Sequence, residues 1–112
     1  MEFTRTPWGY WEVFLEGKNY KVKRIVINPC QMISLQYHKH RVEIWTVVSG
    51  YGVFWVGKDE IGGVVGDYFK VEKEVHHRIV NPAENDILVV IEVQIGDCRE
   101  DDIVRLDDIY GR

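Results

Sequence analysis

The chain has 112 residues, of which 46% are hydrophobic and 29% charged, and its formal net charge is −4. This length and composition predict a single domain, residues 1–112, with its own core. The acidic balance argues against nucleic acid as a partner, and the longest apolar run, 87–91, is too short to span a membrane. Without a signal-peptide pattern or a CxxC pair, the sequence predicts a reducing, cytoplasmic location.

Short segments of alternating polar and apolar residues follow one another along the chain, separated by turn residues. They predict strands at 10–15, 20–28, 32–40, 42–49, 53–56, 68–71, 76–80 and 86–94. The tail at 103–110 is expected to be extended or to form a short helix. No window of about eleven residues keeps a helical period. Roughly ten short strands predict an all-β sandwich or barrel.

Four side chains that can bind a metal lie within one short stretch: Gln36, His38, His40 and Glu43. Successive side chains of a strand alternate between its faces, so the first three point the same way. Glu43 is an odd number of residues away and would point to the opposite face of the strand. It can join the others only if a bulge or bend near 41–42 redirects the chain.

The remaining histidines, His76 and His77, lie together in a later predicted strand. Two clusters that contain every histidine favour one site built from two strands. The alternative is that these polar side chains only cover the surface of a strand. His76 is expected to be a solvated neighbour rather than a ligand.

The spacing of these residues resembles the first motif of the cupins, which are small double-stranded β-helix (jelly-roll) barrels. That motif runs Gly, five residues, His-x-His, three or four residues, Glu, six residues, Gly. His38, Glu43 and Gly50 fit it. Gln36 stands where most cupins have the first histidine, and Cys30 stands where the glycine belongs.

The second cupin motif runs Gly, five residues, Pro-x-Gly, two residues, His, three residues, Asn. Gly66, His77 and Asn81 fit this spacing, whereas Glu72 and Glu74 replace the proline and the glycine. The resemblance therefore implies four metal ligands: Gln36, His38, Glu43 and His77. The two replacements put the local turn beside His77 in doubt, as Cys30 does for the first motif.

Longer stretches resemble the C-terminal isomerase domain of type II phosphomannose isomerases, which is often fused to a GDP-mannose pyrophosphorylase. We expect the free-standing form of that domain. The matching stretches include 7–13, 20–26, 34–41, 77–82, 91–94 and 100–112, and Leu-Gln-x-His-x-His-Arg at 35–41 is the most specific. The resemblance implies interconversion of mannose 6-phosphate and fructose 6-phosphate through an enediolate. Two alternatives stay open: a phosphoglucose isomerase of the cupin type, and a module that only binds a metal or a sugar phosphate.

The expected cofactor is one divalent metal ion, with zinc preferred and Mn, Fe, Co or Ni as alternatives. We expect His40 to act as the general base, with Arg41 beside it in catalysis; His40 could instead only support the site. Lys23, Arg78 and Arg105 are the expected cations for the substrate phosphate. Lys23 could instead lie on the solvated side of its strand. Uncovered sheet edges make a homodimer the expected assembly.

Overall fold

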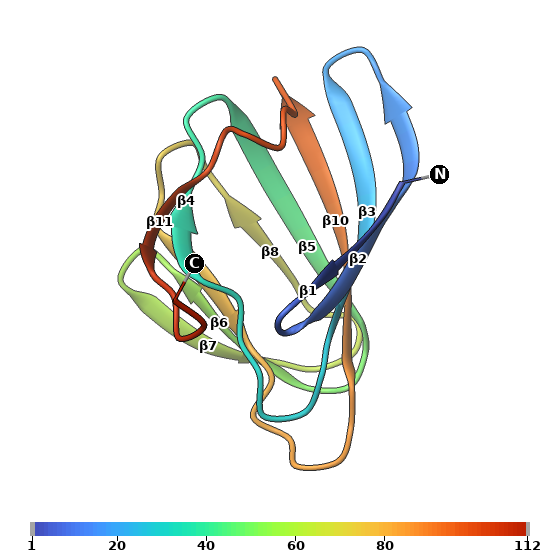
Figure 1. Cartoon of the computed structure of the whole chain (residues 1–112), viewed down its shortest axis with the longest axis vertical. Helices are drawn as coiled ribbons and strands as arrows, with labels where there is room; N and C mark the ends of the chain where they lie inside the picture. Colours follow the sequence, from blue (N-terminus) through green and yellow to red (C-terminus); the bar gives the residue numbers. More distant parts are fainter. Residues whose placement is uncertain (1, 112) are drawn as a thin grey trace.

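Strand pairing organises the chain into two facing antiparallel sheets (Figure 1). The computed structural model describes residues 2–111, which form eleven strands and no helix, so no helix in that range could cross a membrane. The larger sheet has the order β1-β2-β3-β10-β5-β8, and the smaller sheet has the order β11-β4-β9-β6-β7. The all-β prediction is confirmed.

The strands of the larger sheet are β1 (Phe3–Thr6), β2 (Gly9–Gly17), β3 (Tyr20–Ile27), β5 (Arg41–Ser49), β8 (Tyr68–Val71) and β10 (Leu88–Gly96). Those of the smaller sheet are β4 (Leu35–Tyr37), β6 (Gly52–Val56), β7 (Asp59–Gly63), β9 (His77–Val80) and β11 (Val104–Asp107). The C-terminal strand β11 completes the smaller sheet beside β4, and the N-terminal strand β1 lies at the edge of the larger one.

Three neighbouring strands of the larger sheet change from apolar to polar side chains at nearly the same level of the interior. The inward apolar residues of β3, β10 and β5 include Ile25, Ile27, Leu88, Val90 and Val47, and the inward polar residues are Lys21, Lys23, Glu92, Gln94, Arg41 and Glu43. The register nearly aligns the change, because Val90 lies opposite Ile25 and Val47, and Glu92 lies opposite Lys23. On β5 the change comes one inward position later, because Glu92 lies opposite Trp45 and Gln94 lies opposite Glu43. The interior therefore has an apolar half and a polar half.

Aromatic side chains join the two sheets in the apolar half. Trp45 of β5 and Phe54 of β6 are fully buried, with their ring centroids 5.8 Å apart. Phe69 of β8 stacks on Phe54 at 4.5 Å. Burial of large aromatic rings dominates the energetics of a core of this size. This packing fixes the strands whose other ends carry the polar residues.

Some predicted strand limits are wrong in ways that matter for the site. The strand expected at 32–40 is reduced to β4, because the chain bends at 39–40 and leaves the sheet. This bend comes before the expected position at 41–42, so Arg41 already belongs to β5 and points inward with Glu43. β1 was not predicted, since Pro7 and the following residues indicate only a turn. The tail is extended, as β11, rather than helical.

The two positions where this chain lacks a glycine of the cupin motifs keep the backbone conformation that favours glycine. Cys30 has φ 61° and Glu74 has φ 65°. The Glu74 N–H donates to the carbonyl of His38 at 2.7 Å, which ties this turn to the end of β4. The replacements therefore leave both turns in place at some cost in strain. The side chain of Cys30 is exposed.

Replacing Glu74 by glycine is expected to raise the free energy of unfolding by about 1 kcal/mol, because glycine carries no penalty at positive φ. Urea unfolding followed by circular dichroism measures the change. Glu72→Gly is the matched control, since Glu72 is also exposed and has no positive φ. It should lower stability by a few tenths of a kcal/mol, since glycine only adds freedom to the unfolded chain there. Equal effects of the two changes would contradict the strain argument.

Candidate functional site

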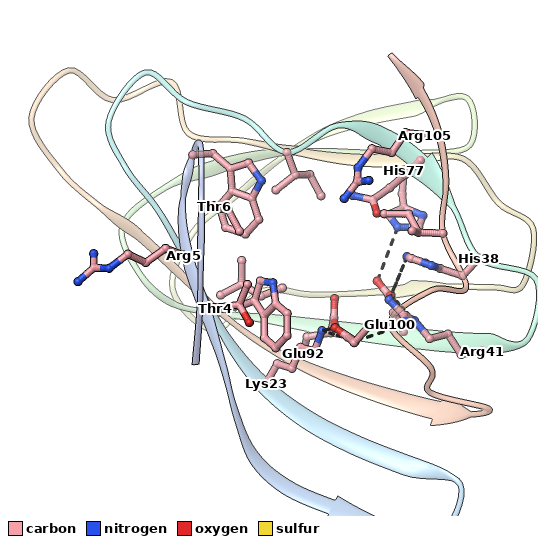
Figure 2. A pocket seen from close by; sticks show the side chains of 17 residues that line it. Thr4, Arg5, Thr6, Lys23, His38, Arg41, His77, Glu92, Glu100 and Arg105 are labelled. Carbon is pink, nitrogen blue, oxygen red and sulfur yellow. Dashed lines mark hydrogen bonds and ion pairs between the residues drawn. The ribbon is translucent and has the colours of Figure 1, made fainter. Parts of the chain in front are cut away.

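Three buried side chains from three strands or their ends converge in the polar half of the interior. His38 follows β4, Glu43 lies in β5 and His77 begins β9. Their ligand atoms all lie within 4.8 Å of one another. Nε2 of His38 is 3.1 Å from Oε2 of Glu43, and Nε2 of His77 is 3.7 Å from Oε1 (Figure 2). The bend at 39–40 makes this convergence possible, because it turns both His38 and Glu43 inward.

Both imidazole rings are oriented by backbone carbonyls. Nδ1 of His38 is hydrogen-bonded to the carbonyl of Asp102, and Nδ1 of His77 donates to the carbonyl of Val75 at 2.9 Å. Each ring therefore presents Nε2 to Glu43. An imidazole that binds a metal through one nitrogen usually donates from the other to a carbonyl or carboxylate, as here.

The contact between His38 and Glu43 requires a cation. Burial, and then the charge of Arg41, lowers the pKa of His38 to about 4, so its imidazole is neutral near pH 7 and Nε2 carries a lone pair. That lone pair faces a carboxylate oxygen at 3.1 Å. Arg41 supplies the positive charge: Nη2 lies 3.1 Å from Nε2 of His38, and Nε donates to Oε2 of Glu43 at 2.9 Å. A divalent metal would use the same lone pairs, so the donor set fits one.

Gln36, the fourth ligand implied by the cupin motif, lies beside these residues. It is directly opposite His77 in the pairing of β4 with β9, and it lines the same pocket. Its amide nitrogen donates to the carbonyl of Ser34 at 3.3 Å. Two imidazoles, a carboxylate and an amide oxygen form a set that suits zinc and the other borderline divalent metals.

A cavity of about 270 Å³ opens in front of these four residues. β1 contributes to its wall with Thr4 and Thr6, and Trp8 and Trp11 follow in the chain. Its other lining residues are Arg5, Lys23, Ile25, Ile33, Gln36, His38, Arg41, Glu43, His77, Glu92, Glu100, Ile103 and Arg105. In Figure 2 the side chain of Arg5 points away from the cavity, whereas Arg105 reaches toward His77. The cavity thus joins the candidate metal ligands to several cations.

The structure separates the cations that were predicted to hold a phosphate. Lys23 and Arg105 line the cavity, and Lys23 is buried rather than solvated. Arg78 does not line it. Its guanidinium donates to the carbonyls of Ile33 and Asp107, both at 2.9 Å, and thereby ties β9 to the segment before β4 and to β11. A role for Arg78 in phosphate binding has no support from this placement.

The predicted catalytic pair is also separated. Arg41 is buried among the candidate ligands, whereas His40 is exposed at the bend and does not line the cavity. The backbone N–H of His40 donates to the Asp102 carboxylate at 2.9 Å. Its position gives no support to a role as general base. His76 is exposed, as expected, and stacks on Tyr37.

Glu92 is a buried residue of the cavity that the sequence reasoning missed. Burial, and then the charge of Glu43, raises the pKa of Glu92. The indole Nε1 of Trp45 donates to both carboxylates, at 3.1 Å for Glu43 and 3.2 Å for Glu92. The sequence contained a signal for this residue, because Glu92 lies on the same face of its strand as the apolar Leu88 and Val90.

Asp102 is a second residue that was missed. Its carboxylate accepts hydrogen bonds from the N–H groups of Lys39 and His40, at 3.0 and 2.9 Å, while its carbonyl fixes His38. Burial favours the neutral carboxyl, but the two hydrogen bonds outweigh it and lower the pKa of Asp102. Asp102 thus holds the bend that brings His38 and Glu43 together. The sequence gives no local signal for this contact, because the partners are more than sixty positions apart.

Comparison with known proteins shows relatives along nearly the whole chain. The family described as mannose-6-phosphate isomerase C-terminal matches residues 2–108. The xanthan biosynthesis protein XanB of Xanthomonas campestris is 40% identical over 107 residues, covering 95% of this chain and 23% of that protein. The mannose-1-phosphate guanylyltransferase ManC of Salmonella typhimurium is 36% identical over 108 residues, covering 95% and 22%. The chain therefore spans less than a quarter of these relatives.

Solved structures agree on the architecture. A cupin-2 domain from Rhodospirillum rubrum matches with a TM-score of 0.79 at 15% sequence identity, covering 96% of this chain and 76% of that one. At this identity the likeness shows the fold alone, and it confirms the cupin barrel implied by the two motifs. Together with the sequence matches, it shows that the chain is a cupin barrel that belongs to the mannose-6-phosphate isomerase C-terminal family.

Proposed function

We propose that the protein interconverts mannose 6-phosphate and fructose 6-phosphate as a metal-dependent aldose–ketose isomerase. The observation that carries this proposal is the convergence of His38, Glu43 and His77 at the wall of a cavity that also presents Lys23 and Arg41. A metal donor set beside buried cations matches a sugar that carries a phosphate. Membership of the family supports the same substrate, and the relatives XanB and ManC support a place in polysaccharide and nucleotide-sugar synthesis.

Gln36, His38, Glu43 and His77 would hold the metal, and zinc is the preferred ion. When bound there, the ion would supply a Lewis acid for the charge that develops on the oxygens of C1 and C2 as the proton moves between these carbons. Residues of the cavity would bind and orient the substrate. Arg41 and Lys23 would orient the anionic substrate, since a guanidinium and an ammonium are the usual phosphate partners in proteins.

The proton transfer needs a group that reaches the substrate in the cavity. Besides the candidate ligand Glu43, the carboxylates of Glu92 and Glu100 line it, and the imidazole of His40 does not. Tests of the general base should begin with Glu92, because it is buried within the cavity wall. An alanine at position 40 is expected to retain turnover.

An isomerase assay on protein loaded in turn with Zn²⁺, Mn²⁺, Fe²⁺, Co²⁺ and Ni²⁺ tests the proposal. Mannose 6-phosphate is the first substrate, and formation of fructose 6-phosphate is followed. We expect turnover that a chelator abolishes. Turnover only on glucose 6-phosphate would show that the substrate is this C2 epimer of mannose 6-phosphate. Bound metal with no turnover on any hexose phosphate would contradict the proposal and favour a module that only binds its ligand.

A further inference from the structure

Three buried cations converge on one carboxylate at the edge of the cavity. The ammonium of Lys23 lies 2.7 and 2.6 Å from the two carboxylate oxygens of Glu100. The ammonium of Lys21 lies 3.7 Å and Nη1 of Arg41 lies 3.9 Å from Oε1 of the same group. Figure 2 shows Lys23, Glu100 and Arg41 together on one side of the cavity. This arrangement is an anion-binding site whose present occupant is a side chain of the protein.

The occupant differs from its partners in burial. Lys21, Lys23 and Arg41 are all buried, whereas the side chain of Glu100 is 35% exposed. Buried ammonium groups need an anion, because the loss of hydration is costly. Here that anion comes from the loop 97–103 rather than from a strand. The loop is fixed nearby, since Arg41 donates to the carbonyl of Arg99 at 3.1 Å. The carboxylate itself can leave toward solvent without unfolding the sheet.

Three cations meet the single charge of Glu100. Glu43 also neutralises Arg41, through the Nε contact at 2.9 Å, and the buried Glu92 lies opposite Lys23 in the strand pairing. Within 4 Å of their ammonium groups, Lys21 and Lys23 share Glu100 between them. Lys21 has one further acidic partner, the exposed Glu16 at 3.9 Å. A phosphate monoester brings up to two negative charges and three strong acceptor oxygens. It therefore suits three converging cationic donors better than one carboxylate does.

The anion site is continuous with the candidate metal site. Lys23, Arg41 and Glu100 line the same cavity as His38, Glu43 and His77. Arg41 contacts both sites, with Nε on Glu43 and Nη1 toward Glu100. A small substrate could therefore reach both sites at once.

We infer that the carboxylate of Glu100 holds the place of the substrate's phosphate group, and that a phosphate displaces it into solvent. The identity of this ligand as a sugar phosphate rests on the proposed function; the exchange of one anion for another rests on the contacts of Glu100. In this arrangement Lys23 is the main phosphate ligand, Arg41 and Lys21 add positive charge beside it, and the carboxylate of Glu100 competes with the phosphate.

Titration of the protein with inorganic phosphate, followed by isothermal calorimetry, tests this inference. Glu100→Gln removes the competing charge and keeps the size of the side chain, so phosphate affinity should rise by about 10-fold, the effect of one charge-assisted contact. The double variant Glu100→Gln with Lys23→Met should lose that gain. An unchanged or lower affinity in Glu100→Gln would overturn the inference.

Asp101→Asn is the matched control. It removes the same charge from the neighbouring position, but the side chain of Asp101 is 82% exposed and pairs with Arg99 at 3.9 Å instead of with the buried cations. Its phosphate affinity should equal that of the original protein. A gain in Asp101→Asn as large as that in Glu100→Gln would reduce the effect to overall charge and overturn the inference.

A measurement on the unaltered protein does not depend on the stability of a variant. The ¹³Cδ chemical shift of Glu100 should move toward that of a solvated glutamate as phosphate is added, and chloride at equal ionic strength should leave it unchanged. Phosphate binding with no change at Glu100 would overturn the exchange. Neither measurement requires turnover, so this inference and the isomerase proposal are tested separately. Absence of turnover would contradict the isomerase proposal but not the exchange of Glu100 for phosphate. Turnover without a change at Glu100 would contradict the exchange but not the isomerase proposal.

Discussion

Replacing Glu43 by glutamine is expected to lower the affinity of the protein for Zn²⁺ by at least about 100-fold, since losing a ligand should exceed the 10- to 100-fold effect of losing a residue that only orients one. Glu43 is buried, and its carboxylate oxygens lie 3.1 and 3.7 Å from the Nε2 atoms of His38 and His77. Glutamine keeps the shape of the side chain but brings no charge to the site. Competition with a chromophoric chelator measures the affinity, and isomerase activity should fall with it.

The control for this change is Glu72→Gln, which removes a carboxylate that is exposed and pairs only with Lys70 at the surface. Its metal affinity should not change. Circular dichroism checks the fold of both variants, because Glu43→Gln also leaves the buried Arg41 without its carboxylate partner. A folded Glu43→Gln protein with undiminished metal content would overturn the ligand set of Gln36, His38, Glu43 and His77.

Replacing Trp45 by alanine is expected to lower the free energy of unfolding by about 3–5 kcal/mol, a large share of the stability of a small domain. Trp45 is buried, packs against Phe54 and meets the ring of His77 edge-on at 5.4 Å. Its loss opens a cavity at the boundary between the apolar and polar halves. Urea unfolding measures the change. Tyr68→Ala is the control, because Tyr68 is 73% exposed and its loss should shift stability by only about 0.5 kcal/mol.

Trp45→Phe separates the two roles of this side chain. Phenylalanine retains most of the packing but cannot donate to Glu43 and Glu92, which accept from Nε1 at 3.1 and 3.2 Å. Leaving buried carboxylates short of a donor costs about 1–3 kcal/mol. The free energy of unfolding of Trp45→Phe should therefore lie between those of the original protein and Trp45→Ala. Stability equal to that of the original protein would show that the indole N–H contributes nothing to the two carboxylates.

The sequence alone predicted the fold class and that His38, Glu43 and His77 share one site, because both depend on local patterns. Alternation of polar and apolar residues is a property of each strand, and the spacing of His38, Glu43 and His77 matches two short motifs. The same pattern contained Lys23 and Glu92 at inward positions. It could not show that the register aligns them, because strand pairing joins segments far apart in the chain.

Contacts from the C-terminal loop were beyond prediction for the same reason. Asp102 and Glu100 appear in the sequence as members of an acidic stretch, yet one holds the bend at 39–40 and the other meets buried lysines. Arg78 illustrates the same limit. The sequence offered it as one of several cations for the phosphate, but alternation along β9 directs its side chain away from the cavity, where it binds backbone carbonyls.

The change from apolar to polar residues along β3, β5 and β10 has a consequence for protein engineering. Residues on which folding depends and residues on which chemistry depends lie on the same three strands, but at opposite ends of each. A library that varies positions 21, 23, 92 and 94 would sample new anions and new substrates while Ile27, Val47 and Leu88 stay constant. The polar residues of the barrel can therefore be substituted while the residues that hold the fold are kept.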